Sequence, residues 1–146
     1  MALLSLDPSS LWAQVPPSFE TLPVVVTEEE VRKFLDDYTV QYMKKDIYAF
    51  MAFFSKEAIE NRMYPYLDIH EIYRRTFESS DTIQYRLEIY SIQAEAQHAG
   101  VMGRYEITQA LKGLAGNRVL KGNIQWYLVR EDGSLRIREI NYGRDR

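Results

Sequence analysis

The sequence predicts a single α+β domain in which three N-terminal helices pack on a curved, mainly antiparallel sheet. Two observations predict it: helical periodicity fills residues 27–78, whereas apolar and polar residues alternate through much of residues 83–142. Helices followed by a run of strands are typical of α+β domains with the helices on one face of the sheet. The length of 146 residues suits one such domain.

The chain opens with a segment that is unlike the rest. Residues 1–26 hold four of the five prolines, and proline interrupts both helix interiors and sheet ladders. We therefore expect a proline-rich linker or N-terminal extension over residues 1–26 and a folded domain over residues 27–146.

The first helix is expected to begin at Thr27, because Thr27 and the three glutamates after it form a capping box at the positive helix end. Asp46 then caps a second, short helix over residues 47–54. A short strand follows around residues 58–63, and Asp68 caps a third helix. The apolar face of the first helix recurs at helical spacing and consists of Val31, Phe34, Leu35, Tyr38 and Tyr42.

Strands occupy the rest of the chain. Residues 83–89 and 99–111 alternate between apolar and polar side chains, as half-buried strands do. Residues 121–142 read as one long hairpin, since two apolar runs flank the turn around Asp132-Gly133 and Asp-Gly is a strong hairpin signal.

The first strand of this hairpin is apolar on both alternating sets. Ile124, Trp126 and Leu128 lie on one face, and Tyr127 and Val129 lie on the other. A strand with water on one side would not show this pattern, so we expect both faces to be covered. Helices cover one face. A second copy of the chain is expected to cover the other, in a homodimer through Ile124, Trp126 and Leu128.

Tyrosine is in excess, at 11 of 146 residues. Regularly spaced aromatics are most often core, but a buried phenol also needs a partner for its hydroxyl group. Several such tyrosines beside amide side chains would line an apolar cavity with a few polar groups, the usual make-up of a small-ligand site. The expected pocket residues are Tyr38, Tyr42, Tyr105, Asn123, Gln125 and Tyr127.

Composition excludes several classes of function. The net charge of −3 argues against nucleic acid as a partner. Four C-terminal arginines are interrupted by acidic residues and indicate a solvated edge: Arg136, Arg138, Arg144 and Arg146. Cysteine is absent, which excludes disulfides, thiolate catalysis and zinc bound through sulfur. The two histidines, His70 and His98, stand far apart, so no metal-ligand spacing is present and no cofactor is expected.

No apolar stretch approaches the roughly 20 residues that span a bilayer. Residues 1–26 also lack the basic start and the uninterrupted apolar core of a signal peptide. We therefore expect no membrane insertion and, by default, a cytoplasmic location.

The order of elements resembles the nuclear transport factor 2-like superfamily, the cystatin-like roll shared by ketosteroid isomerase and SnoaL-like polyketide cyclases. The resemblance covers residues 27–142. It rests on the first helix ending at Lys45-Asp46, on the segment KDIYAFMAFFSKEAIEN, and on the terminal hairpin with Trp126. It implies a cone-shaped α+β roll, a fold that hosts isomerases, dehydratases, cyclases and pure binding modules.

The catalytic groups of ketosteroid isomerase are a tyrosine, a general-base aspartate and a protonated aspartic acid. Counted from the shared aspartate, the resemblance puts Tyr38 at the tyrosine position, Arg62 at the base position with Asn61 beside it, and Gln125 at the acid position. Neither Arg62 nor Asn61 accepts a proton near neutral pH, so no catalytic residue is predicted. A shifted register would bring Glu60 or Asn61 to the base position.

We therefore predict a non-catalytic dimerisation domain with a helix-capped pocket for a small apolar or aromatic ligand, serving as an accessory module of a larger bacterial protein. The alternative is a SnoaL-like isomerase, cyclase or dehydratase acting on a small hydrophobic ring substrate, with Tyr38 as oxyanion donor and Asp37 or Glu60 as base. A peptide adaptor like the transport factor itself is a third alternative, and it needs an exposed groove. The first two readings differ in whether an Asp, Glu or His projects into the cavity near Tyr38.

Overall fold

The computed structural model describes residues 24–146. The predicted proline-rich extension, residues 1–26, therefore lies outside the described residues except for its last three. Of these, Val26 is buried and donates its backbone N–H to the carbonyl oxygen of Ala96 at 3.2 Å.

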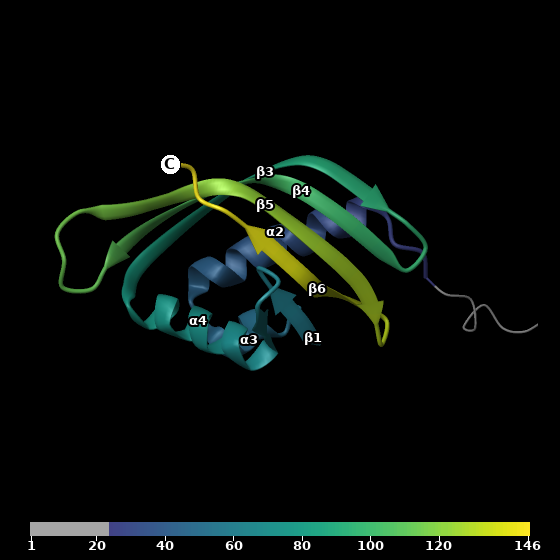
Figure 1. Cartoon of the computed structure of the whole chain (residues 1–146), viewed down its shortest axis with the longest axis horizontal. Coiled ribbons are helices and arrows are strands. Elements are labelled where there is room, and N and C mark those ends of the chain that lie inside the picture. The colour runs from purple at the N-terminus through teal and green to yellow at the C-terminus, as the bar shows by residue number, and fades with distance from the viewer. Residues whose placement is uncertain (1–23) are drawn as a thin grey trace, which may run out of the picture.

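Within residues 24–146, three helices lie on the concave side of a curved six-stranded sheet, so the predicted α+β roll is confirmed. Figure 1 shows the long strands β3 (Ser80–Ala94), β4 (His98–Leu111) and β5 (Asn117–Glu131) arching over helix α2 (Glu28–Lys44). The strand order is β2-β1-β6-β5-β4-β3. Helix α4 (Tyr66–Glu78) and the short α3 close the lower side of the arch.

Helix α2 begins and ends as its sequence predicts. The Oγ1 atom of Thr27 accepts the backbone N–H of Glu30 at 3.2 Å, which satisfies a free donor of the first turn. The helix ends at Lys45, which adopts a left-handed conformation (φ 58°) and donates its backbone N–H to the carbonyl oxygen of Tyr42. The buried face of the helix consists of Val31, Leu35, Tyr38 and Tyr42.

Helix α3 (Ile47–Met51) is shorter than predicted. Asp46 caps it by accepting the backbone N–H groups of Tyr48 and Ala49, both at 3.1 Å. The helix stops early because Phe54 already belongs to strand β1 (Phe54–Glu60), and the carbonyl oxygen of Phe53 accepts the backbone N–H of Ile137 in β6. The third helix, α4, also starts two residues earlier than its predicted cap at Asp68.

The predicted C-terminal hairpin is confirmed as β5 and β6 (Ser134–Tyr142), joined at Asp132-Gly133 with both residues at positive φ. A pairing that the sequence did not indicate joins β1 to β6 in parallel, so the first and last strands of the domain lie side by side. The two-residue strand β2 (Tyr64–Pro65) then forms the outer edge.

The predicted orientation of β5 was wrong. Trp126 is fully buried within the single chain, on the concave face with Ile124 and Leu128, and its ring meets that of Tyr38 edge-to-face at 5.9 Å. Asn123, Gln125 and Tyr127, the alternate set, are exposed on the convex face. If Asn123 and Gln125 pointed inward, their amide groups would lose their hydrogen bonds to water. The indole of Trp126, in contrast, packs against the apolar side chains under α2.

The three side chains expected at a dimer face therefore belong to the core of one chain. Ile124, Trp126 and Leu128 have at most 4% of their surface exposed, so they present nothing to a partner. Within residues 24–146, none of the helices combines the length and the apolar character needed to cross a bilayer.

Candidate functional site

A cavity of about 350 Å³ lies between α2, α4 and the concave face of the sheet. Its size falls within the range of roughly 300–1,000 Å³ that is usual for small-ligand sites. Its walls come from every long element of the fold: Tyr38, Tyr42, Ile72, Tyr73, Arg75, Thr76, Ser79, Tyr85, Tyr105, Ile107, Gln109, Arg118, Leu120, Ile124, Tyr142 and Arg144.

Six tyrosines dominate the walls. Tyr42 is central to the group, because its ring meets those of Tyr73 at 5.9 Å and of Tyr85 at 5.0 Å, both edge-to-face. Burial raises the pKa of Tyr38, Tyr42, Tyr73, Tyr85 and Tyr142 above the ordinary value of a phenol. These hydroxyl groups therefore stay neutral at physiological pH and act as hydrogen-bond donors and acceptors.

A buried carboxyl group lies behind this wall. Glu60, the last residue of β1, has no exposed surface, and its Oε1 atom accepts the hydroxyl group of Tyr73 at 2.5 Å. Among the described residues its Oε2 atom has no hydrogen-bond partner. Burial raises the pKa of Glu60, and the hydroxyl groups of Tyr73 and the nearby Tyr142 partly oppose the shift. A carboxyl group with a raised pKa, bonded to a wall tyrosine, can exchange a proton closer to neutrality than an exposed one.

The residues around the base position that the resemblance implied point in different directions. Asn61 and Arg62 lie in the turn after β1, both at positive φ, and Arg62 is exposed. The side-chain oxygen of Asn61 accepts the backbone N–H of Tyr142 at 2.9 Å, which ties the turn to β6. The inward carboxyl group is instead Glu60, which the shifted register had offered.

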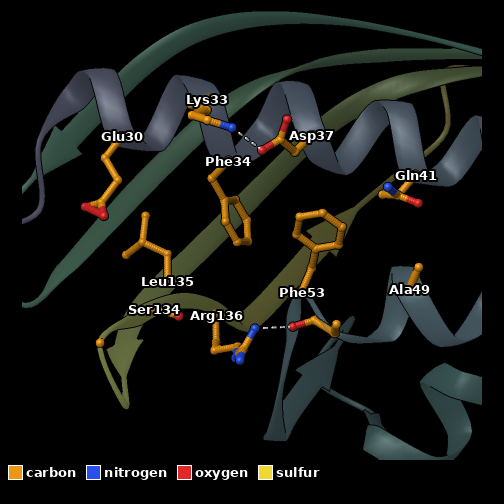
Figure 2. A pocket seen from close by; sticks show the side chains of 12 residues that line it. Glu30, Lys33, Phe34, Asp37, Gln41, Ala49, Phe53, Ser134, Leu135 and Arg136 are labelled. Atoms are coloured by element: carbon orange, nitrogen blue, oxygen red, sulfur yellow. Dashed lines mark hydrogen bonds and ion pairs between the residues drawn. The ribbon is translucent and has the colours of Figure 1, made fainter.

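Asp37, the other candidate base of the SnoaL-like catalytic alternative, faces a different hollow. This hollow has a volume of about 400 Å³ and lies between α2, α3 and the β5–β6 turn (Figure 2). At its edge, the Nζ atom of Lys33 donates a hydrogen bond to the Oδ2 atom of Asp37 at 2.7 Å. Phe34 and Phe53 meet edge-to-face at its centre. Lys33 and Asp37 are largely exposed and already paired, so we do not place proton-transfer chemistry here.

The structure divides the predicted pocket residues into two groups. Tyr38, Tyr42 and Tyr105 line the cavity together. Asn123, Gln125 and Tyr127 lie on the convex face of the sheet and do not contribute, because β5 is turned the other way.

Both histidines lie away from the cavity. The ring of His70 is 6.2 Å from that of Tyr48, and His98 lies 5.5 Å from the ring of Tyr127 on the sheet. Within residues 24–146, no three His, Asp or Glu side chains gather in a way that could hold a metal ion.

Three arginines that sequence reasoning missed line the open side of the cavity. We call Arg75, Arg118 and Arg144, from α4, β5 and the segment after β6, the arginine rim. One signal could have found Arg118: it lies six residues before Ile124, so strand alternation places both on the same face once that face is known. Arg144 was instead attributed to a solvated edge.

Comparisons with solved structures agree with this architecture, whereas comparisons by sequence find no match. No protein-family model matches the chain, and no curated protein sequence matches it. Among solved structures, a nuclear transport factor 2-like superfamily protein from Salmonella enterica is similar at a TM-score of 0.70 and 16% identity, over 81% of this chain and 90% of that one. A ketosteroid isomerase-like protein from Erwinia carotovora is similar at 0.66 and 18% identity, over 83% and 99%.

A third similar structure is a longer chain. It is the Bd1075 protein of Bdellovibrio bacteriovorus, similar at a TM-score of 0.67 and 12% identity over 81% of this chain but only 40% of that one. The layered helices, the strand order and these likenesses agree: the chain has the nuclear transport factor 2-like fold.

Proposed function

We propose that this domain binds a small apolar or aromatic molecule in the tyrosine-lined cavity, and that it does so without catalysing a reaction. The observation that carries the proposal is the composition of the wall. Among the described residues, those lining the cavity are tyrosines, aliphatic side chains, small polar groups and three arginines, with no Asp, Glu or His. Such a wall recognises a ligand by shape and by phenol hydrogen bonds, and no carboxyl or imidazole group among the described residues lines it to act as a general base.

Two neighbouring residues of β5 provide a matched test. Leu120 lines the cavity, whereas Val119 is exposed on the opposite face of the same strand. Leu120→Trp fills the cavity, and Val119→Trp adds the same bulk outside it. Binding of naphthylmethanol, measured by calorimetry, should be lost in Leu120→Trp and kept in Val119→Trp. Equal binding by both variants would place the ligand elsewhere, and absence of binding by the unmodified protein would refute the proposal for this ligand class.

The catalytic alternative is favoured by one specific observation, the Tyr73–Glu60 hydrogen bond. In this alternative the fold acts as an isomerase, cyclase or dehydratase, as the name of the ketosteroid isomerase-like neighbour suggests. Tyr73 would touch the substrate, and Glu60 would act through it by holding or releasing the proton. Glu60→Gln would then abolish proton exchange at the carbon next to the carbonyl group of a bound ring ketone while leaving its affinity intact. Unchanged exchange in the variant would remove this alternative.

A homodimer also remains a proposal, with a different surface from the one first expected. The convex face of the sheet exposes Tyr90, Met102 and Tyr127, and a two-fold dimer would bury this set against itself. Light scattering should show a dimer that Met102→Glu converts to a monomer. A monomeric unmodified protein, or an unchanged mass in the variant, would contradict it.

The accessory role in a larger bacterial protein is supported by the third similar structure, of which this chain covers only 40%. A domain of this fold thus occurs within a longer chain. Expression of the native gene in its source organism, followed by mass measurement, tests the role directly. A native product no longer than this chain would contradict it.

A further inference from the structure

The charged side chains that line the cavity are all positive and lie on one side of it. The arginine rim contributes three guanidinium groups, and no acidic residue among those described lines the cavity with them. We propose that the ligand carries an anionic group that binds between Arg118 and Arg144, while its apolar body extends inward to the tyrosines. This inference rests on the proposed binding function and names the chemical class of the ligand, an organic carboxylate with an apolar ring.

The sheet register places Arg118 over the cavity. Arg118 pairs directly with Gln109 of β4, so the two side chains leave the sheet on the same face. Gln109 is buried on the concave face, where its Nε2 atom donates to the hydroxyl oxygen of Ser80 at 2.8 Å. The guanidinium group of Arg118 therefore projects over the cavity from the exposed end of β5.

The backbone around Arg144 is held on both sides. The carbonyl oxygen of Gly143 accepts the hydroxyl group of Tyr105 at 2.7 Å, and the backbone N–H of Asp145 donates to the carbonyl oxygen of Lys121 at 2.8 Å. Asp145 also pairs with Arg104. With its neighbours fixed, Arg144 directs its side chain to the cavity. Burial raises the pKa of Tyr105, and the positive charge of Arg144 partly opposes this shift, as expected for groups that lie close together.

Two of the three rim arginines, Arg118 and Arg144, differ from the arginines of α4, Arg74 and the third rim member Arg75. Arg74 is paired with both Glu71 and Glu78, and Arg75 shares Glu71. Within residues 24–146, neither Arg118 nor Arg144 takes part in an ion pair. Two guanidinium groups that line the cavity and are not engaged in an ion pair there suit a carboxylate, which arginine binds through paired N–H donors.

The buried carboxyl group of Glu60 bears on the orientation in which an anionic ligand would bind. Glu60 lies behind the inner tyrosine wall, where a second negative charge would be repelled or would force Glu60 to stay protonated. An amphipathic anion therefore binds with its charged group outward at the rim and its ring inward.

Two probes of the same shape test the proposal. Naphthoate carries the carboxylate, and naphthylmethanol replaces it with a neutral hydroxyl group. Naphthoate should bind at least about tenfold more tightly, because charge-assisted hydrogen bonds are stronger than neutral ones. Arg118→Gln and Arg144→Gln should each remove most of this preference, measured as the ratio of the two affinities in the same variant. Arg86→Gln is the matched control, since Arg86 is exposed on β3 and does not line the cavity.

The outcomes separate this inference from the proposed function. If both probes bind equally to the unmodified protein, the cavity binds ligands but the rim does not select anions, and the inference is overturned alone. If neither probe binds, the inference and the binding function fall together. If Arg86→Gln lowers naphthoate affinity as much as the rim variants do, the effect is one of overall charge and the assignment to the rim is wrong. Unchanged thermal unfolding of each variant, followed by circular dichroism, guards against misfolding.

Discussion

Replacing Tyr73 by Phe removes one hydroxyl group and leaves the ring that packs under α2. In the unmodified protein this hydroxyl donates to Glu60 at 2.5 Å in a fully buried setting. A hydrogen bond to a charged group contributes about 1.5–3 kcal/mol, and an unpaired buried carboxylate costs at least as much. Because domains of this size are stable by about 5–15 kcal/mol, we expect Tyr73→Phe to lower the free energy of unfolding by about 2–3 kcal/mol at neutral pH.

The loss should depend on pH in a defined direction. Burial raises the pKa of Glu60 in the folded state, so the folded protein holds this proton more tightly than the unfolded chain does. The contribution of Glu60 to stability is therefore complete below its unfolded pKa and is lost as pH rises through the raised folded value. Removing the hydroxyl raises the folded value further, so the destabilisation by Tyr73→Phe must grow from acid to neutral pH.

Urea unfolding followed by far-ultraviolet circular dichroism measures both effects, at neutral pH and at about pH 4. Glu60→Gln is the comparison, because a neutral amide accepts the same hydrogen bond but does not titrate. Its stability relative to the unmodified protein should increase with pH over the same range. An equal loss by Tyr73→Phe at both pH values, or a loss below about 0.5 kcal/mol, would refute a buried, titrating Glu60.

Three further predictions concern the frame around the cavity. Trp126→Ala should lower the free energy of unfolding by about 3–5 kcal/mol, because it leaves a cavity in the core. Trp126→Phe should lower it by clearly less, because phenylalanine keeps an aromatic ring there and removes an indole N–H that lacks a partner among the described residues. Similar losses for the two variants in urea unfolding would contradict this. Gly122→Ala should destabilise the segment after β6, because a Cβ atom would meet the carbonyl oxygen of Gly143, and unchanged amide exchange there would count against it. Asp46→Ala should cost about 0.5–2 kcal/mol through loss of the α3 cap, and a neutral effect on thermal unfolding would argue that the cap is dispensable.

Local chemistry made the elements of this fold predictable. The helix cap at Thr27, the helical spacing of the apolar residues of α2 and the Asp-Gly turn each depend on residues only a few positions apart, and all three are confirmed. The reciprocal bond of the capping box does not form, because the carboxylate of Glu30 pairs with Arg130 instead. The length of α3 was overestimated because Phe53 and Phe54 continue its apolar pattern, whereas the backbone there is already committed to pairing with β6. The parallel contact between β1 and β6 has no local signature.

The candidate site was only partly predictable, for a related reason. Tyr38, Tyr42 and Tyr105 lie on α2 and β4 and line the cavity. Alternation divides β5 into two sets but does not say which set faces the helices, so Asn123 and Gln125 were expected on the wrong face. The apolar side chains of α2 decide which face of β5 turns inward, because an indole packs favourably against an aromatic surface whereas an amide without a hydrogen-bond partner does not.

The parallel pairing of β1 with β6 also has a consequence for how the molecule assembles during synthesis. Apart from the two-residue β2, β1 has no neighbouring strand until the last strand is made. Contacts between segments this distant in sequence form slowly, so we expect the sheet to be completed late in folding. A nascent chain that stalls before Ser134 lacks β6 and, with it, Tyr142 and Arg144 of the cavity wall.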